Sequence, residues 1–265
     1  MVVQHNLRAL NSNRMLGLTT ASQTKSTEKL SSGYKINRAA DDAAGLAISE
    51  KMRRQVRGLT QAAANAQDGI SCVQTAEGAL NEVHDMLQRM NELAVKAVNG
   101  TNQTDDKAYI QSEIDQLASE ITRTSNDTTF NKMGLLNSNT TFTLQVGTEQ
   151  GHTISVGLSS MTATSIGVGS LQISSDASIT SIDAAIQSVS KFRSDLGAVQ
   201  NRLEHTINNL QNVAENTQAA ESQIRDTDMA TEMVKYANNN ILAQAGQAML
   251  AQSNQANQGV LSLLQ

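Results

Sequence analysis

The chain has 265 residues, a net charge of −5 and 2% aromatic residues, with one cysteine and no proline. Hydrophobic residues make up 39% of it, which is below the roughly 45–50% of an ordinary globular domain. A compact globule would need aromatic and branched aliphatic side chains for its core, so the composition favours thin seams between long helices that no proline interrupts. The acidic balance argues against a nucleic-acid partner, and a single cysteine excludes an internal disulfide and a cysteine-rich zinc site.

The distribution of apolar residues argues against two further classes of protein. No run approaches the ~20 apolar residues that span a bilayer, so we expect no membrane partner. Residues 1–15 lack the uninterrupted apolar core of a secretory signal peptide. We therefore expect a protein that stays in the cytoplasm or leaves the cell by a route that uses no cleaved signal.

Residues 1 to about 137 are predicted to be helical. Apolar residues at steps that alternate between four and three run from Met52 to Ala97, and so long a stripe is typical of a coiled coil or a helical bundle. It predicts one helix over about 43–99. A second helix is predicted to start near Thr104, and the short link between the two indicates an antiparallel pair.

The predicted ends of these helices carry local signals. Asp41 and Asp42 lie where an N-cap and first-turn acids belong, and Asp105 and Asp106 do the same for the second helix. Gly100 follows the first helix and is expected to end it in the left-handed conformation. The helix dipole explains both pairs of acids without a catalytic role.

The middle of the chain, about residues 138–178, is rich in Ser, Thr and Gly. Two runs of alternating apolar residues joined by a short glycine-containing loop predict a β-hairpin; they are Phe142, Leu144 and Val146, then Ile154, Val156 and Leu158. Residues 159–178 are expected to be irregular surface chain with a possible short strand. Residues 179–224 return to a long apolar stripe and predict another helix.

Both ends of the chain are sparse in apolar residues. Neither end alone can offset the entropy of becoming ordered, so each needs a partner, first the other end and then copies of the same chain. Repeated contact between different surface patches of identical chains builds open helical filaments. We assign to this terminal assembly seam Leu7, Leu10, Leu18, Ile241, Leu242, Met249, Val260, Leu263 and Leu264.

No motif for catalysis or for cofactor or metal binding is recognisable. The four histidines, His5, His84, His152 and His205, are scattered, and the sequence contains no zinc motif, phosphate-binding loop or nucleophile elbow. Cys72 falls in an apolar helical run and is expected to be a buried thiol. We expect no catalytic residue, no cofactor and no metal, and the chain is not predicted to be an enzyme.

Two long segments resemble one known family. KLSSGYKINRAADDAAGLAISEKMRRQVRGLTQAAANAQDGISCVQTAEGAL, residues 29–80, resembles the N-terminal region of bacterial flagellins, and NILAQAGQAMLAQSNQANQGVLSLLQ, residues 240–265, resembles their C-terminal region. The resemblance implies a mainly α fold, which is an elongated antiparallel helical bundle or coiled coil with a small β-hairpin and paired termini. It also implies a short form without the large outer domains of many flagellins.

The resemblance further implies a division of the chain into filament layers. Residues 1–42 would pair with 225–265 as the coiled coil of the filament core. The surrounding bundle would contain helices in 43–137, the hairpin and a short surface segment in 138–178, and a C-terminal helix in 179–224.

The implied function is that of a structural subunit that polymerises into the bacterial flagellar filament for swimming; the alternative is a hook-associated protein of the hook–filament junction. The implied location is outside the cell, after unfolded export by the flagellar export apparatus without a cleaved signal. Implied partners are copies of the chain, an export chaperone, and the filament cap and hook-associated proteins.

The segment Met86–Gly100 resembles the flagellin stretch that the animal innate receptor Toll-like receptor 5 recognises. The resemblance points to Gln88, Arg89, Leu93 and Glu113. Filament packing competes for the same four residues, so we expect this face to contact neighbouring subunits, the receptor or both.

Overall fold

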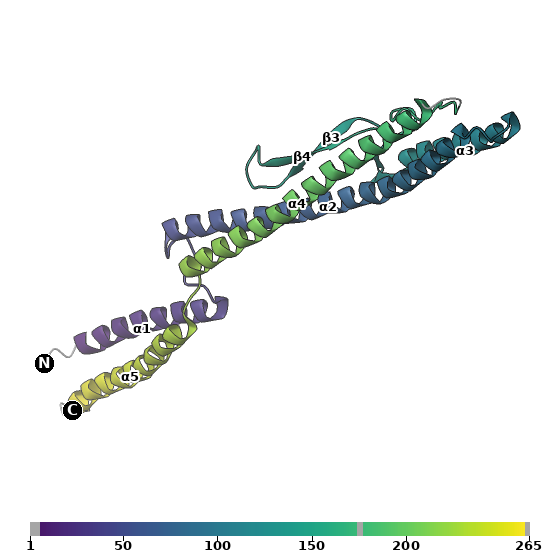
Figure 1. Ribbon diagram of the computed structural model, residues 1–265. Coiled ribbons are helices and arrows are strands. Elements are labelled where there is room, and N and C mark those ends of the chain that lie inside the picture. The colour runs from purple at the N-terminus through teal and green to yellow at the C-terminus, as the bar shows by residue number, and fades with distance from the viewer. Residues whose placement is uncertain (1–5, 174–176, 263–265) are drawn as a thin grey trace. The chain divides into compact units, whose positions relative to one another are not determined.

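The computed structural model describes residues 6–173 and 177–262, with side chains to residue 256 (Figure 1). The fold is mainly α-helical with two small antiparallel sheets, which confirms the predicted fold class. In chain order the elements are α1 (Leu7–Ser32), α2 (Ala43–Val98), α3 (Thr104–Asp127), β1 (Thr129–Phe130), β2 (Met133–Gly134), β3 (Thr140–Gln145), β4 (Thr153–Leu158), α4 (Ala177–Arg225) and α5 (Met229–Ser262).

The chain forms two compact units. Residues 1–54 and 216–265 make up one, which we call the terminal unit, and residues 55–215 make up the other, the bundle unit. Their limits fall inside α2 and α4, whereas the sequence placed its layer limits after residues 42 and 224. The assignment of these ranges to filament layers remains a prediction.

The core of the bundle unit lies between α2, α3 and α4. Asn91 on α2 donates to Asp183 on α4 at 3.3 Å, and Glu77 lies 3.8 Å from Arg193, so α2 and α4 are antiparallel. The predicted α2 stripe is the buried face of the helix. Its fully buried members include Val73, Leu80, Val83, Leu87 and Met90.

The predicted β-hairpin is present, with Thr140 paired to Leu158 at one end and Gln145 to Thr153 at the other. It packs on the bundle helices, since Leu144 contacts a buried cluster that contains residues of α2 and α4. Gly69 of α2 makes the close approach possible, because a Cβ there would clash with Leu144 Cδ1.

Residues 159–173 are not the surface chain that the sequence predicts, and they contain no strand. Met161, Ala163, Val168 and Ile173 are buried in the bundle core. Their burial is supported by helix side chains, as the Ser125 hydroxyl donates to the Met161 carbonyl at 2.7 Å. Residues 174–176 of the predicted segment lie outside the described residues.

Two smaller expectations need correction. The first region is not continuously helical to residue 137, because β1 and β2 form a tight hairpin in which Asn131 and Lys132 have φ values of 48° and 65°. Gly100 does not adopt the left-handed conformation; Gly33 does, with φ 75°, at the end of α1. Turn hydrogen bonds end α2 instead, including one from Asn99 N to the Lys96 carbonyl at 3.3 Å.

The acids at the helix starts behave differently from one another. Asp42 is the N-cap of α2, because its carboxylate accepts from the Gly45 amide at 2.9 Å. Asp41 turns back instead and accepts from the Arg38 and Asn37 amides at 3.0 and 3.2 Å, and these bonds lower the pKa of its carboxyl. At α3, Asp106 accepts from the Gln103 amide at 3.1 Å.

Candidate assembly surface on the paired terminal helices

Helices α1 and α5 lie side by side and antiparallel within the terminal unit (Figure 1). Near the start of α1, Asn6 Nδ2 donates to the Ser253 carbonyl at 3.2 Å, and near its end the Ser26 hydroxyl donates to Glu232 at 2.7 Å. The described parts of the two ends are therefore paired, as the sequence predicts.

The facing surfaces of this pair are narrow and largely polar. Buried or partly buried residues recur along both helices at steps of three and four, which is the spacing of a coiled-coil seam. On α1 they are Ala9, Ser12, Leu16, Thr19, Gln23, Ser26 and Leu30, and on α5 Glu232, Tyr236, Asn239, Ala243, Gly246, Leu250 and Ser253. Few of these side chains are large and apolar, so the seam buries little hydrophobic surface.

Most of the large apolar side chains on the two helices point away from the partner helix. All six described members of the predicted terminal assembly seam are more than half exposed; they are Leu7, Leu10, Leu18, Ile241, Leu242 and Met249. Met15, Met233 and Val234 are exposed with them. These residues therefore do not join α1 to α5, and we call them the outer apolar stripes. The Val260 side chain and residues Leu263 and Leu264 lie outside the described part.

A clasp at one end of the pair ties together the α1–α2 and α4–α5 links. The Arg225 guanidinium stands 4.7 Å from the centre of the Tyr34 ring and donates to Glu50 at 2.7 Å. The Lys35 amide donates to the Arg225 carbonyl at 2.6 Å. Such a cation–π contact with a charge-assisted hydrogen bond is strong for a link region. The sequence analysis missed it because Tyr34 and Arg225 are far apart in the chain.

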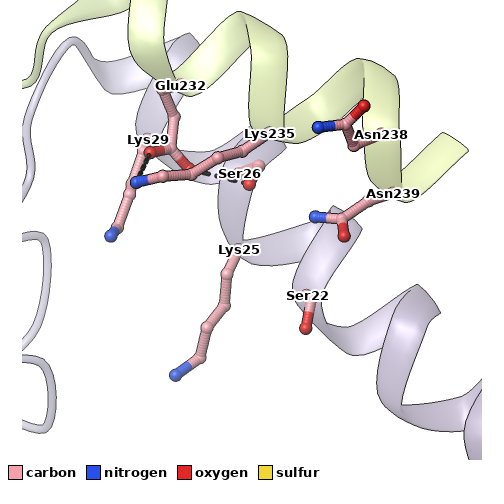
Figure 2. A pocket seen from close by; sticks show the side chains of 8 residues that line it. All are labelled: Ser22, Lys25, Ser26, Lys29, Glu232, Lys235, Asn238 and Asn239. Carbon is pink, nitrogen blue, oxygen red and sulfur yellow. Dashed lines mark hydrogen bonds and ion pairs between the residues drawn. The ribbon is translucent and has the colours of Figure 1, made fainter.

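Glu232 is buried in the α1–α5 seam, with only 5% of its surface exposed. Its carboxylate accepts from the Ser26 hydroxyl and lies 3.2 Å from Lys235 Nζ. The Ser26 hydrogen bond is the main reason that its pKa is lowered, followed among the favourable contacts by Lys235, and burial opposes this shift. Figure 2 shows this carboxylate in a pocket lined by Ser22, Lys25, Ser26, Lys29, Glu232, Lys235, Asn238 and Asn239.

The second predicted site lies in the bundle unit and is only partly a surface. Arg89 pairs with Glu113 across α2 and α3 at 2.9 Å, which raises the pKa of the guanidinium. Gln88 is exposed beside it and hydrogen-bonds to His84 at 2.9 Å. Leu93 is buried in the core, so it supports this face from within and offers no contact to a partner.

The other candidate residues give no chemical site. Cys72 is buried as expected, and burial raises the pKa of its thiol. Within residues 6–173 and 177–262, no group of three His, Cys, Asp or Glu side chains could hold a metal. No helix in the same ranges is long and apolar enough to cross a membrane.

Comparison with known families decides the identity. Residues 3–141 match the model of the bacterial flagellin N-terminal helical region, and residues 179–264 match that of the C-terminal helical region. The chain belongs to the bacterial flagellin family. A flagellin is a structural protein and not an enzyme, in agreement with the sequence analysis.

Relatives of similar length support this assignment over the full chain. A flagellin of Halalkalibacterium halodurans is 52% identical and that of Bacillus subtilis 47% identical, each with complete coverage of both chains. The flagellar filament 31.3 kDa core protein of Treponema maltophilum is 48% identical, also with full coverage. The solved structure of Bacillus cereus flagellin is 30% identical with a TM-score of 0.50, over 56% of this chain and 88% of that one. Nothing in these relatives favours the hook-associated alternative.

Proposed function

We propose that the outer apolar stripes of α1 and α5 are covered by neighbouring copies of the chain when this flagellin, a structural subunit of the flagellar filament, polymerises. The supporting observation is that the terminal pair exposes most of its large apolar residues, while the residues between its helices are mainly small or polar. Soluble proteins seldom leave such a surface uncovered.

The energetic argument favours copies of the chain as the cover. Full burial of a Leu, Ile or Met side chain contributes about 1.5–3 kcal/mol, so the outer stripes offer on the order of 10 kcal/mol per subunit before the entropy of association is subtracted. Two different faces, one on each helix, allow a head-to-tail contact that repeats without closing. An open polymer is the expected product.

We also propose partners other than copies of the chain. The chain from residue 236 to its end carries no Asp, Glu, Lys or Arg. An uncharged tail with a thin seam suits late ordering, which supports unfolded export by the flagellar apparatus without a cleaved signal and protection by an export chaperone. Filament cap and hook-associated proteins would contact the polymer outside the cell. The exposed Arg89–Glu113 face, with Gln88, supports contact with neighbouring subunits and with Toll-like receptor 5.

Ile241 allows a direct test of the proposed interface between copies. The side chain is 64% exposed, so Ile241→Lys should leave the soluble chain folded, with an unchanged circular dichroism melting curve, because its charge stays in water. Burial in a polymer would remove the charge from water; we expect at least a tenfold loss of sedimentable filament.

The matched control is Ile241→Met, which keeps an apolar side chain of similar volume and should polymerise like the parent chain. Normal filament yield from Ile241→Lys would contradict the proposed interface.

A further inference from the structure

The connection between α2 and α3 contains the one Asn-Gly pair of the sequence, Asn99 with Gly100. An asparagine followed by glycine is chemically labile, because the missing glycine side chain lets the backbone nitrogen approach the asparagine amide closely. A regular helix protects such a pair, since it holds the backbone amide in a hydrogen bond. The conformation of the connection therefore decides whether the pair can react.

The turn leaves both reacting groups unrestrained. Asn99 and Gly100 are exposed and follow the end of α2. Among the residues that the structure describes, none forms a hydrogen bond with the Asn99 side chain or accepts one from the Gly100 amide. The amide nitrogen is therefore free to turn towards the side chain of the residue before it.

We propose that Asn99 is a site of spontaneous deamidation in which the Gly100 backbone nitrogen is the nucleophile. After losing its proton to hydroxide, this nitrogen attacks Cγ of Asn99, the new C–N bond closes a succinimide ring, and the side-chain nitrogen leaves as ammonia. Water then opens the ring at one of its two carbonyls. The products are aspartate and isoaspartate, in which the backbone runs through the former side chain. The inference goes beyond the proposed function and does not depend on the terminal unit.

The isoaspartate product should loosen the end of α2. The Asn102 amide donates to the Asn99 carbonyl at 3.3 Å, and the Asn102 side chain donates to the Lys96 carbonyl, so Asn102 satisfies carbonyls that the helix leaves open at its end. Isoaspartate lengthens the backbone at this point and moves Asn102 relative to both acceptors. The new carboxylate also lies at the negative end of the helix dipole. We therefore expect the last turn of α2 to open more often in modified chains.

Trypsin provides a direct readout on the full chain. Cleavage after Lys96 and Lys107 releases residues 97–107, AVNGTNQTDDK, which contain Asn99 and, as an internal reference, Asn102. Folded protein is aged at neutral and at mildly alkaline pH and then digested, and unaged protein sets the background. Mass spectrometry locates the change from amide to acid, and methylation by an isoaspartyl methyltransferase measures the isoaspartate.

Gly100→Ala is the matched control. Gly100 lacks the left-handed φ that would need glycine, and a Cβ there would meet nothing within 4 Å, so the variant should keep the turn while its methyl group hinders the attack. We expect Asn99 to convert at least tenfold faster than Asn102, and faster at alkaline pH. Gly100→Ala should slow this conversion at least tenfold. Amide hydrogen exchange in the last turn of α2 should be at least threefold faster in the aged parent chain than in equally aged Gly100→Ala.

Conversion of Asn99 no faster than that of Asn102, or at equal rates in the parent chain and Gly100→Ala, would overturn the proposed site. Conversion without faster hydrogen exchange would overturn the predicted opening of α2. Neither result bears on the interface that Ile241→Lys tests, so the two proposals can fail separately.

Discussion

At the scale of single residues, Glu232 shows how a charge can be stable inside a helix pair. The hydrogen bond from the Ser26 hydroxyl and the ion pair with Lys235 offset the free-energy cost of removing the Glu232 carboxylate from water. The positive charge of Lys29 also lowers the pKa of the Glu232 carboxyl. Stabilisation of this charged form makes the pair sensitive to acid.

The pH dependence follows from the direction of this shift. The folded pKa of Glu232 lies below its unfolded value of about 4.3. Its contribution to stability is therefore complete above that value and is lost as the pH falls through the folded pKa. We expect the difference in melting temperature between the parent chain and Glu232→Gln to be constant from pH 7 to about 5 and to shrink below about 4.

Ser26→Ala is the control for this measurement. It removes the main cause of the lowered pKa, so the acid loss should begin at a higher pH than in the parent chain. A difference between the parent chain and Glu232→Gln that does not change down to pH 3 would contradict the role of the carboxylate.

The sequence predicts the role of some of these residues in assembly but does not predict the burial of Glu232, and the reason is physical. Leu18 and Ile241 were predicted to serve assembly, but spacing alone does not say whether a residue faces the other helix or a neighbouring chain. Glu232 gave no signal because it lies in the first turn of α5, where the helix dipole already accounts for an acid. Its pairing with Ser26 depends on two segments 206 residues apart.

At the scale of elements, apolar periodicity predicts the long helices because every turn must place an apolar residue on the same buried face. The limits of α2 and the start of α3 agree with the sequence to within a residue or two. Irregular chain has no such repeat. Burial of residues 159–173 depends on helix side chains such as Gln111, which accepts from the Ile173 amide at 3.0 Å and donates to the Leu171 carbonyl at 2.7 Å.

Alanine substitutions at two glycines of α2 distinguish the contribution of helix propensity to stability from that of hairpin packing. A Cβ on Gly78 would meet nothing within 4 Å, so Gly78→Ala should stabilise the chain by about 0.5–1 kcal/mol. Gly69→Ala brings the same gain in propensity but forces Leu144 to move, so its net effect should be smaller or destabilising. Urea unfolding of the full chain measures both variants, and equal stabilisation would show that the hairpin does not pack closely on Gly69.

At the scale of the whole molecule, the two units differ in where their apolar residues lie. The bundle unit encloses large side chains such as Leu80, Leu87 and Ile114. The terminal unit exposes the outer apolar stripes and has a seam of small and polar residues. The bundle unit already buries its apolar core, whereas the terminal unit leaves apolar side chains exposed. Such a chain is suited to fold its bundle unit alone and to bury the apolar side chains of its terminal unit on assembly.

The most direct measurement is the accessibility of an outer-stripe residue before and after polymerisation. Met249 is 57% exposed, so Met249→Cys in a Cys72→Ser background provides a reactive thiol, and Glu149→Cys in the hairpin loop reports the access of the reagent to the polymer. The account predicts that maleimide labels Met249→Cys quickly in the soluble chain and at least tenfold more slowly in sedimented filaments. Equal labelling rates in the two states would contradict it.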